Sequence, residues 1–398
     1  IEYAAFGGCH NLAEMTIPFV GQDREDNQNS NATTFGWIFG GVIVGHTINT
    51  PSALYEVRQN TRTHLVPTKL TKVTVTDVDT IGDNAFINVS KLETVILPMG
   101  YGYAPHPVVT DAADQKPFVK IGSSAFENCT SLTVVTDGET LADGSYINQF
   151  PVSTTTIGSG AFRNCTSLPT IIITENVEEM GDYAFEKCDV LNNVLFKTRE
   201  LEAINEGVFY DCCSLTTMTY LNEEGLEVGD ENVITILDTV MRLGSVAFYN
   251  CSSATQIVVP DNVYSVGYKV FGRCINLNNL ITPFVGDINT FPCDYTDKSL
   301  TYDGSNKVLG YLFGFTSEPQ EGMHEIRQYY NATQYVDAYV PTELTEMTLT
   351  NTLVIHYGAY YNVDTITQIT LPSNLKVIEG YAFYNDNVDH ISTLTTVI

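Results

Sequence analysis

Hydrophobic positions along the chain follow a short pattern that returns about every 23 residues. One half of the pattern places a Leu three residues before an alternating apolar-x-apolar pair, as in Leu168, Ile171 and Ile173. Alternation with a period of two is typical of a β-strand with one buried face. Each repeat is therefore predicted to contribute one such strand.

The other half of the pattern reads Ile-Gly-x-x-Ala-Phe-x-x-Cys-x-x-Leu. Clear copies begin at Ile81, Ile121, Ile157, Met180, Ile204, Leu243 and Val266. Apolar residues three apart predict a short helical or 3₁₀ turn. The Phe is expected to fill the core of each rung, and the Gly is expected to permit a sharp corner.

Stacked copies of this unit predict one solenoid over residues 1–398 with about twelve rungs. The repeats resemble the BspA-like leucine-rich repeats of bacterial surface proteins, and the resemblance covers nearly the whole chain. It implies an α/β repeat solenoid: a right-handed, β-rich leucine-rich-repeat superhelix with one sheet and short turns. It also implies secretion and a role in adhesion and host contact.

Two large insertions interrupt the array, at residues 19–67 and 284–341, and they repeat each other. Phe35-Gly36-Trp37-Ile38-Phe39-Gly40 returns as Leu309-Gly310-Tyr311-Leu312-Phe313-Gly314, and Glu56-Val57-Arg58-Gln59 as Glu325-Ile326-Arg327-Gln328. Their alternation predicts added β-hairpins. Smaller polar expansions at 99–118, 137–152 and 221–238 are predicted to be loops.

The charge balance limits the partners. With 19 basic and 47 acidic residues the net charge is −28, and no basic stripe indicates nucleic-acid binding. No apolar stretch is long enough for a membrane helix. Because both ends fall inside a repeat, the chain is expected to be part of a longer protein, whose leader, anchor and other domains its sequence cannot identify. A monomer is expected.

Seven of the nine cysteines share one position in the repeat: residues 9, 129, 165, 188, 212, 251 and 274. Side chains stacked on neighbouring rungs run parallel, whereas a disulfide needs converging Cβ atoms. A ladder of small buried thiols is therefore predicted. Cys213 and Cys293 lie outside it.

Candidate catalytic and metal-binding patterns are weak. Ile157-Gly158-Ser159-Gly160 fits a rung corner better than a nucleophile elbow, and no carboxylate pair, Cys/His pair or phosphate loop converges. We expect neither an enzyme nor a cofactor. Asp77 and Asp79, and a cluster at Glu223, Glu224, Glu227, Asp230 and Glu231, could hold Ca²⁺, but solvated acidic loops explain them better.

The outward strand positions are the first candidate binding surface. They form a stripe without charge: Thr170, Ile172, Asn193, Leu195, Thr217, Thr219, Gln256 and Val258. Such a ledge suits a protein surface or an extended peptide, although solvent-facing strands favour Thr and Val in any case. In the insertions, Trp37 and Tyr311 could offer an aromatic platform to a sugar, but a packing role suits their setting better.

Three functions remain open from the sequence. The first is an extracellular scaffold that binds a protein, such as a host or extracellular-matrix ligand, and mediates adhesion at the cell surface. The alternatives are a carbohydrate- or cell-wall-binding module and a passive surface spacer.

Overall fold

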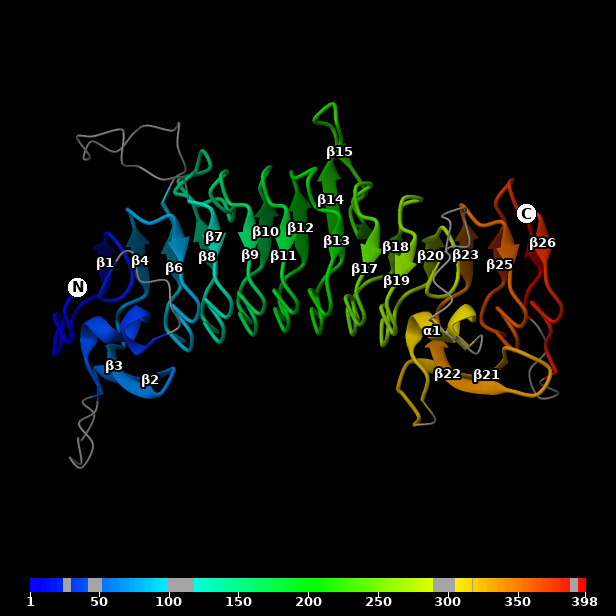
Figure 1. The fold of residues 1–398 in the computed structure, drawn as a ribbon, viewed down its shortest axis with the longest axis horizontal. Coiled ribbons are helices and arrows are strands. Elements are labelled where there is room, and N and C mark those ends of the chain that lie inside the picture. The colour runs from blue at the N-terminus through cyan, green and yellow to red at the C-terminus, as the bar shows by residue number, and fades with distance from the viewer. Residues whose placement is uncertain (24–29, 42–51, 99–117, 289–304, 317, 387–392) are drawn as a thin grey trace. The chain divides into compact units, whose positions relative to one another are not determined.

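The computed structural model describes residues 1–23, 30–41, 52–98, 118–288, 305–316, 318–386 and 393–398. It divides into two compact units, residues 1–201 and 202–398. Each unit is a stack of rungs whose main strands pair in parallel, as Figure 1 shows. The solenoid predicted from the repeats is thus present in each unit, and helix is scarce. The stretch predicted as loop at 99–118 lies almost entirely outside the described residues.

In unit 1 the main strands form parallel sheets that present one face to the core. Four of them pair in chain order: β1 (Glu14–Ile17), β4 (Lys72–Val75), β6 (Thr94–Ile96) and β8 (Val134–Thr136). A further pair joins β10 (Thr170–Ile173) to β12 (Asn193–Phe196). Alternate residues are buried, as the period-two pattern predicts.

In unit 2 the main sheet is continuous. Its parallel strands follow in the order β14 (Thr217–Leu221), β16 (Val233–Thr235), β18 (Gln256–Val258), β20 (Asn279–Thr282), β23 (Glu346–Leu349), β25 (Gln368–Thr370) and β27 (Thr396–Val397). The short β15 (Glu227–Val228) turns back and pairs antiparallel with β14.

Among the described residues, nine rungs have a second, two-residue strand at the Ile-Gly position. In unit 1 these strands are β5 (Thr80–Ile81), β7 (Lys120–Ile121), β9 (Thr156–Ile157) and β11 (Glu179–Met180). In unit 2 they are β13 (Ala203–Ile204), β17 (Arg242–Leu243), β19 (Ser265–Val266), β24 (Val354–Ile355) and β26 (Val377–Ile378).

A Gly follows six of these short strands, and at five of the six positions it is needed for close approach, which corrects the expectation of a sharp corner. A Cβ on Gly158 would lie 2.5 Å from the backbone nitrogen of Ser123, and one on Gly267 would lie 2.2 Å from that of Ser245. Neither glycine has a positive φ. The rungs can stack at this spacing only because the position lacks a side chain.

The Ala-Phe-x-x-Cys arc consists of consecutive turns rather than a helix. In the rung of Phe86, the N–H groups of Ala85, Ile87 and Val89 each bond to the carbonyl three residues earlier. The alternate N–H groups of Asn84, Phe86 and Asn88 donate to the next rung. Two residues per arc adopt a left-handed conformation, such as Asn84 and Asn88 with φ of 57° and 64°. All these backbone donors are therefore satisfied without a helix.

The Phe of each arc stacks on its neighbours to form a column. In unit 1 the ring centroids of Phe86, Phe126, Phe162 and Phe185 follow at 5.2, 5.2 and 5.4 Å. The adjacent cysteines form the predicted buried ladder, each thiol donating to the Phe carbonyl of the preceding rung, as from Cys129 to Phe86 at 3.2 Å. Cys9 departs from this prediction, because it is exposed. Cys293 lies outside the described residues.

Each large insertion contributes one antiparallel hairpin, as predicted, but its Gly-aromatic run is helical instead of extended. The first contains η1 (Asn31–Thr33), η2 (Phe35–Phe39), β2 (Leu54–Gln59) and β3 (Arg62–Pro67). The second contains η3 (Ser305–Lys307), α1 (Gly310–Phe313), β21 (Met323–Tyr329) and β22 (Tyr335–Pro341). The Phe35 ring packs against the Phe86 ring at 4.9 Å, and the Phe35 N–H donates to the Ala85 carbonyl, so the helical run takes the place of an arc.

Candidate functional site

The outward face of β10 and β12 is the candidate surface of unit 1. Thr170 lies opposite Asn193 and Ile172 opposite Leu195 in the parallel register. Thr170 and Asn193 are exposed, and Ile172 and Leu195 are half-buried. The structure therefore brings these four predicted residues together as an uncharged patch. The first strands of the unit carry charged residues instead, and Lys72 and Glu14 form an ion pair there at 3.4 Å.

The predicted stripe of unit 2 needs two corrections. Thr219 does not face solvent: only 4% of it is exposed, and its hydroxyl donates to the Glu227 carboxylate at 2.7 Å beneath the β14–β15 hairpin. Thr217 and Thr219 also do not adjoin Gln256 and Val258, because β16 lies between β14 and β18.

The remaining outward residues of unit 2 keep the uncharged character in part. Thr217, Gln256 and Val258 are half-buried. Beyond them the outward positions carry Asn279 on β20, but an exposed Glu346 on β23. The uncharged surface is thus limited to the strands before β23.

Both smaller described expansions contain strand-like segments that the polar-loop interpretation missed. Within 221–238, Val233–Thr235 forms β16. Within 137–152, Gln149 bridges Ile172 in parallel and the Asn148 carbonyl accepts the N–H of Ile172. The signal was present at Val233-Ile234-Thr235-Ile236, whose alternation follows that of the main strands.

A buried glutamine fastens each large insertion to the rung that follows it. The Gln59 side-chain oxygen accepts the N–H of Gly36 at 2.6 Å, and its nitrogen donates to the carbonyls of Ala85 and Ile87 at 3.3 and 3.0 Å. Gln328 does the same, accepting from Gly310 at 2.6 Å and donating to Ala359 at 3.0 Å. The repetition of this Gln in both insertions was the available sequence signal, and its hydrogen bonds explain the Gln of the shared Glu-x-Arg-Gln motif.

Trp37 and Tyr311 occupy equivalent, half-buried positions in the two insertions. Trp37 meets Tyr3 edge-on at 4.8 Å and its indole nitrogen donates to the Ile1 carbonyl at 3.2 Å. Tyr311 meets Tyr268 edge-on at 5.5 Å. These contacts use the rings to hold the insertion on the preceding rung and leave the sugar-platform role as an untested prediction.

Burial sets the chemistry of the thiols and of one histidine. Desolvation raises the pKa of Cys274 to about 12, and it also raises the pKa of Cys165, Cys188 and Cys251. These thiols therefore stay protonated and unreactive at neutral pH. Burial lowers the pKa of His64, which is completely enclosed between the first hairpin and η2.

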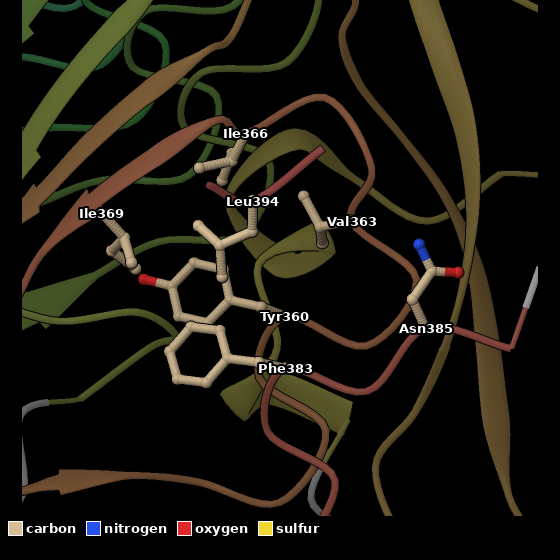
Figure 2. Close-up of a pocket in the computed structure, with 7 residues that line it drawn as sticks. All are labelled: Tyr360, Val363, Ile366, Ile369, Phe383, Asn385 and Leu394. Carbon is tan, nitrogen blue, oxygen red and sulfur yellow. The ribbon is translucent and has the colours of Figure 1, made fainter. Parts of the chain in front are cut away.

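A small cavity lies between the last described rungs of unit 2. Its walls are mainly apolar: Tyr360, Val363, Ile366, Ile369, Phe383, Asn385 and Leu394 (Figure 2). Tyr360 occupies the rung position of the arc Phe and stacks on Phe383 at 5.0 Å. We interpret the cavity as a packing gap beside the Tyr360 ring, since no charged group lines it.

Ligand-binding clusters are few in the part of the chain that the structure describes. It holds no group of three His, Cys, Asp or Glu side chains placed to bind a metal ion. The acidic residues at 223–231 surround the β14–β15 hairpin, where Glu227 is engaged by Thr219. Nor does any helix in this part have the length and apolarity to cross a membrane.

Comparisons with solved structures return leucine-rich repeat proteins. One from Bacteroides ovatus is 18% identical, with a TM-score of 0.42, over 86% of this chain and 72% of that one. A leucine-rich cell surface protein from Faecalibacterium prausnitzii is 19% identical, with a TM-score of 0.31, over 86% and 85%. A search of curated proteins gives no match.

The repeat model for the BspA type leucine rich repeat region matches in six copies, over residues 36–104, 144–231, 230–292 and 335–398. These matches cover more than half of the sequence and include most of the arcs and main strands of both units. The chain belongs to the BspA-type leucine-rich repeat family.

Proposed function

We propose that the chain is a non-enzymatic extracellular scaffold that binds protein partners at the cell surface, and that adhesion is the outcome. The observation that carries the proposal is the uncharged outward face of β10 and β12. On a chain with a net charge of −28, four adjacent outward residues are Thr, Asn, Ile and Leu. Depletion of charge is what distinguishes the core of a protein interface from other surface.

The half-buried side chains of Ile172 and Leu195 are the anchors of this surface. They lie opposite each other on neighbouring strands, flanked by the polar Thr170 and Asn193. An apolar centre with a polar rim is the usual anatomy of a protein interface. Membership of a family of repeat scaffolds supports the same function, because stacked rungs offer an extended binding surface.

The test is binding of the chain to immobilised extracellular-matrix proteins and bacterial surface proteins, measured by biolayer interferometry. The double variant Ile172→Glu/Leu195→Glu buries two carboxylates in any interface on this face, and we expect binding to fall at least about 10-fold. The matched control is Val152→Glu/Val190→Glu, which adds the same charge at aliphatic residues that are 44% and 41% exposed.

Equal loss in both variants would assign the effect to charge alone. If the folded chain bound none of these proteins saturably, the passive spacer would be the better function. Either result overturns the proposal.

A further inference from the structure

Six tyrosines gather in unit 2 where the β21–β22 hairpin meets the arcs of the next two rungs. We call Tyr329, Tyr335, Tyr357, Tyr361, Tyr381 and Tyr384 the tyrosine patch. Tyr329 contacts Tyr335 and Tyr361 with ring centroids at 5.4 and 5.0 Å. Tyr384 contacts Tyr361 and Tyr381 at 5.3 and 5.2 Å, and Tyr357 joins through Tyr381 at 5.3 Å.

Much of the tyrosine patch faces solvent. Tyr335, Tyr381 and Tyr384 are 44%, 54% and 46% exposed, whereas Tyr361 beneath them is only 6% exposed. Exposed aromatic rings that touch one another are unusual on a soluble surface, because each could have been replaced by a polar residue. A surface of this kind indicates a binding site.

The rings are inclined to one another, which decides between two kinds of ligand. Five of the six contacts within the patch have interplanar angles between 44° and 68°, and the sixth, between Tyr361 and Tyr381 at 6.5 Å, has an angle of 26°. A glycan that stacks several sugar units needs a continuous flat aromatic platform, which mutually inclined rings do not provide. A cation is attracted to the faces of several inclined rings at once.

The patch already holds one cation of its own. The guanidinium of Arg327 lies over the Tyr335 ring, 4.3 Å from its centroid. The same guanidinium donates from Nε and Nη2 to the two Asp337 oxygens at 2.8 and 3.4 Å. A tyrosine face with a nearby carboxylate therefore binds an arginine at one edge of the patch.

Asp386 supplies a second carboxylate at the other edge. It is exposed, and its two oxygens accept from the Tyr361 hydroxyl and the Asn362 amide, each at 2.8 Å. Both donors are neutral, and a carboxylate has about four acceptor sites. Among the described residues, no Lys, Arg or His forms an ion pair with Asp386.

The Tyr361 phenol fixes this carboxylate in place. Burial, together with the hydrogen bond to Asp386, raises the pKa of Tyr361, so its hydroxyl remains a donor throughout the neutral range. The backbone N–H of Asp386 also donates to the Asn362 side chain at 2.9 Å. Asp386 is therefore held at the hydroxyl of Tyr361, whose ring contacts both Tyr381 and Tyr384, and it has lone pairs available to a ligand.

We propose that the tyrosine patch and Asp386 bind an arginine-bearing segment of a protein partner. The guanidinium stacks on Tyr381 or Tyr384 and donates to Asp386, in the arrangement that Arg327 shows with Tyr335 and Asp337. The net charge of −28 attracts such a basic segment. The inference rests on the proposed protein-binding function and names the partner chemistry of a second surface.

Fluorescence anisotropy of a labelled peptide of alternating Gly and Arg tests this inference on the full chain. The comparison peptide carries citrulline in place of arginine, which keeps the shape but removes the charge. We expect citrulline to weaken binding at least about 10-fold, and Tyr381→Ala/Tyr384→Ala to weaken it about 5- to 30-fold. Asp386→Asn should weaken it about 3- to 10-fold.

Matched variants separate the site from the general negative field. Tyr210→Ala/Tyr249→Ala removes another tyrosine pair of unit 2, stacked at 4.7 Å, and Glu223→Gln removes an exposed carboxylate. Both should bind the arginine peptide within about twofold of the wild type. Circular dichroism and a thermal melt confirm that each variant is folded.

Equal affinity for the citrulline peptide, or equal loss in the control variants, would overturn the inference. The inference would also be overturned if the wild-type chain bound glycans on an array but not the arginine peptide, and if Tyr381→Ala/Tyr384→Ala lost the glycan binding. The sheet-face variant Ile172→Glu/Leu195→Glu should bind the peptide normally. A failure of this inference is therefore distinguishable from a failure of the proposed function.

Discussion

At the scale of single residues, the left-handed positions of the arcs are the most demanding feature of the repeat. The position before the arc Ala carries Asn84 at φ 57°, Gly160 at 59° and Gly207 at 59°, but Val246 at 50°. Asn and Gly tolerate this conformation, whereas a β-branched side chain is strained there. Among the described arcs only Val246 places a β-branched residue at this position, where the others carry Ala, Asn, Ser, Gly, Tyr or Lys.

Replacing Val246 with Asn should relieve this strain and raise the free energy of unfolding by about 1 kcal/mol. The matched control is Val246→Thr, which has nearly the size of Val and is still β-branched. Thermal unfolding by circular dichroism measures both variants. A gain in the Thr variant as large as in the Asn variant would show that polarity, and not backbone strain, governs this position.

His64 makes unit 1 sensitive to acid. Burial lowers its folded-state pKa below the usual 6.5, while the unfolded chain keeps the ordinary value. The unfolded state therefore binds more protons as pH falls below about 6.5, and the free energy of unfolding decreases by up to about 1.4 kcal/mol per pH unit. Above that pH the His64 contribution is constant.

The measurement is a series of thermal melts from pH 7.5 to 5 on the wild type and His64→Ala. Ala338 occupies the equivalent hairpin position of the second insertion, where it bridges Phe315 as His64 bridges Gly41. The variant should lose stability at pH 7.5 through the lost packing but show a weaker decrease below pH 6.5. Parallel curves for the two proteins would mean that His64 does not titrate in this range.

At the scale of the element, the repeat pattern predicts what each rung buries better than how its backbone runs. In the clear copies that begin at Ile81 to Val266, the Leu, Phe and Cys positions are buried where predicted, because hydrophobic periodicity reports directly on burial. The arc was predicted to be a helical turn, yet alternate N–H groups donate to the next rung. Whether the arc N–H groups bond within the arc or to the next rung depends on residues far away in sequence, which the local spacing of apolar residues cannot report.

The candidate surfaces were predictable to different degrees for the same reason. Thr170 and Asn193 face outward because strand alternation fixes the face of each residue. Thr219 alternates in the same way, but a hairpin from the following expansion covers it. The tyrosine patch combines the second hairpin with two separate arcs, and no local motif brings those segments together.

The Gly that follows six of the short strands gives an element-scale prediction. Gly158→Ala places a Cβ 2.5 Å from the Ser123 backbone, so neighbouring rungs must move apart. We expect a loss of about 1–3 kcal/mol in the free energy of unfolding, the usual cost of overpacking. Denaturation in urea measures it.

Gly82 provides the matched control in the same motif and the same unit. A Cβ on Gly82 would meet no atom within 4 Å, and its φ is not positive. Gly82→Ala should therefore leave stability unchanged or raise it by about 0.5–1 kcal/mol, through the lower entropy of the unfolded chain. Equal losses at Gly82 and Gly158 would show that flexibility, and not rung spacing, selects this Gly.

At the scale of the whole molecule, stacked uncharged cores carry a strongly acidic surface. The net charge of −28 on 398 residues keeps such a protein soluble but repels itself in the compact state. In the part of the chain that the structure describes, two close Arg–carboxylate pairs join Arg163 to Glu186 at 2.6 Å and Arg327 to Asp337 at 2.8 Å. With 19 basic residues against 47 acidic ones, most carboxylates cannot each have a basic partner.

Screening should therefore stabilise the folded chain. Raising NaCl from about 0.01 M to about 0.1 M shortens the Debye length from about 30 Å to about 10 Å, which removes most repulsion between distant carboxylates. We expect the melting temperature to rise by about 2–4 °C, which corresponds to about 1 kcal/mol for units of this size. The triple variant Glu223→Gln/Glu224→Gln/Glu231→Gln should melt higher than the wild type at low salt and gain less from added NaCl. If the melting temperature of neither protein changed with salt, local pairing would already screen the acidic surface. The net charge would then affect solubility and the choice of partner rather than stability.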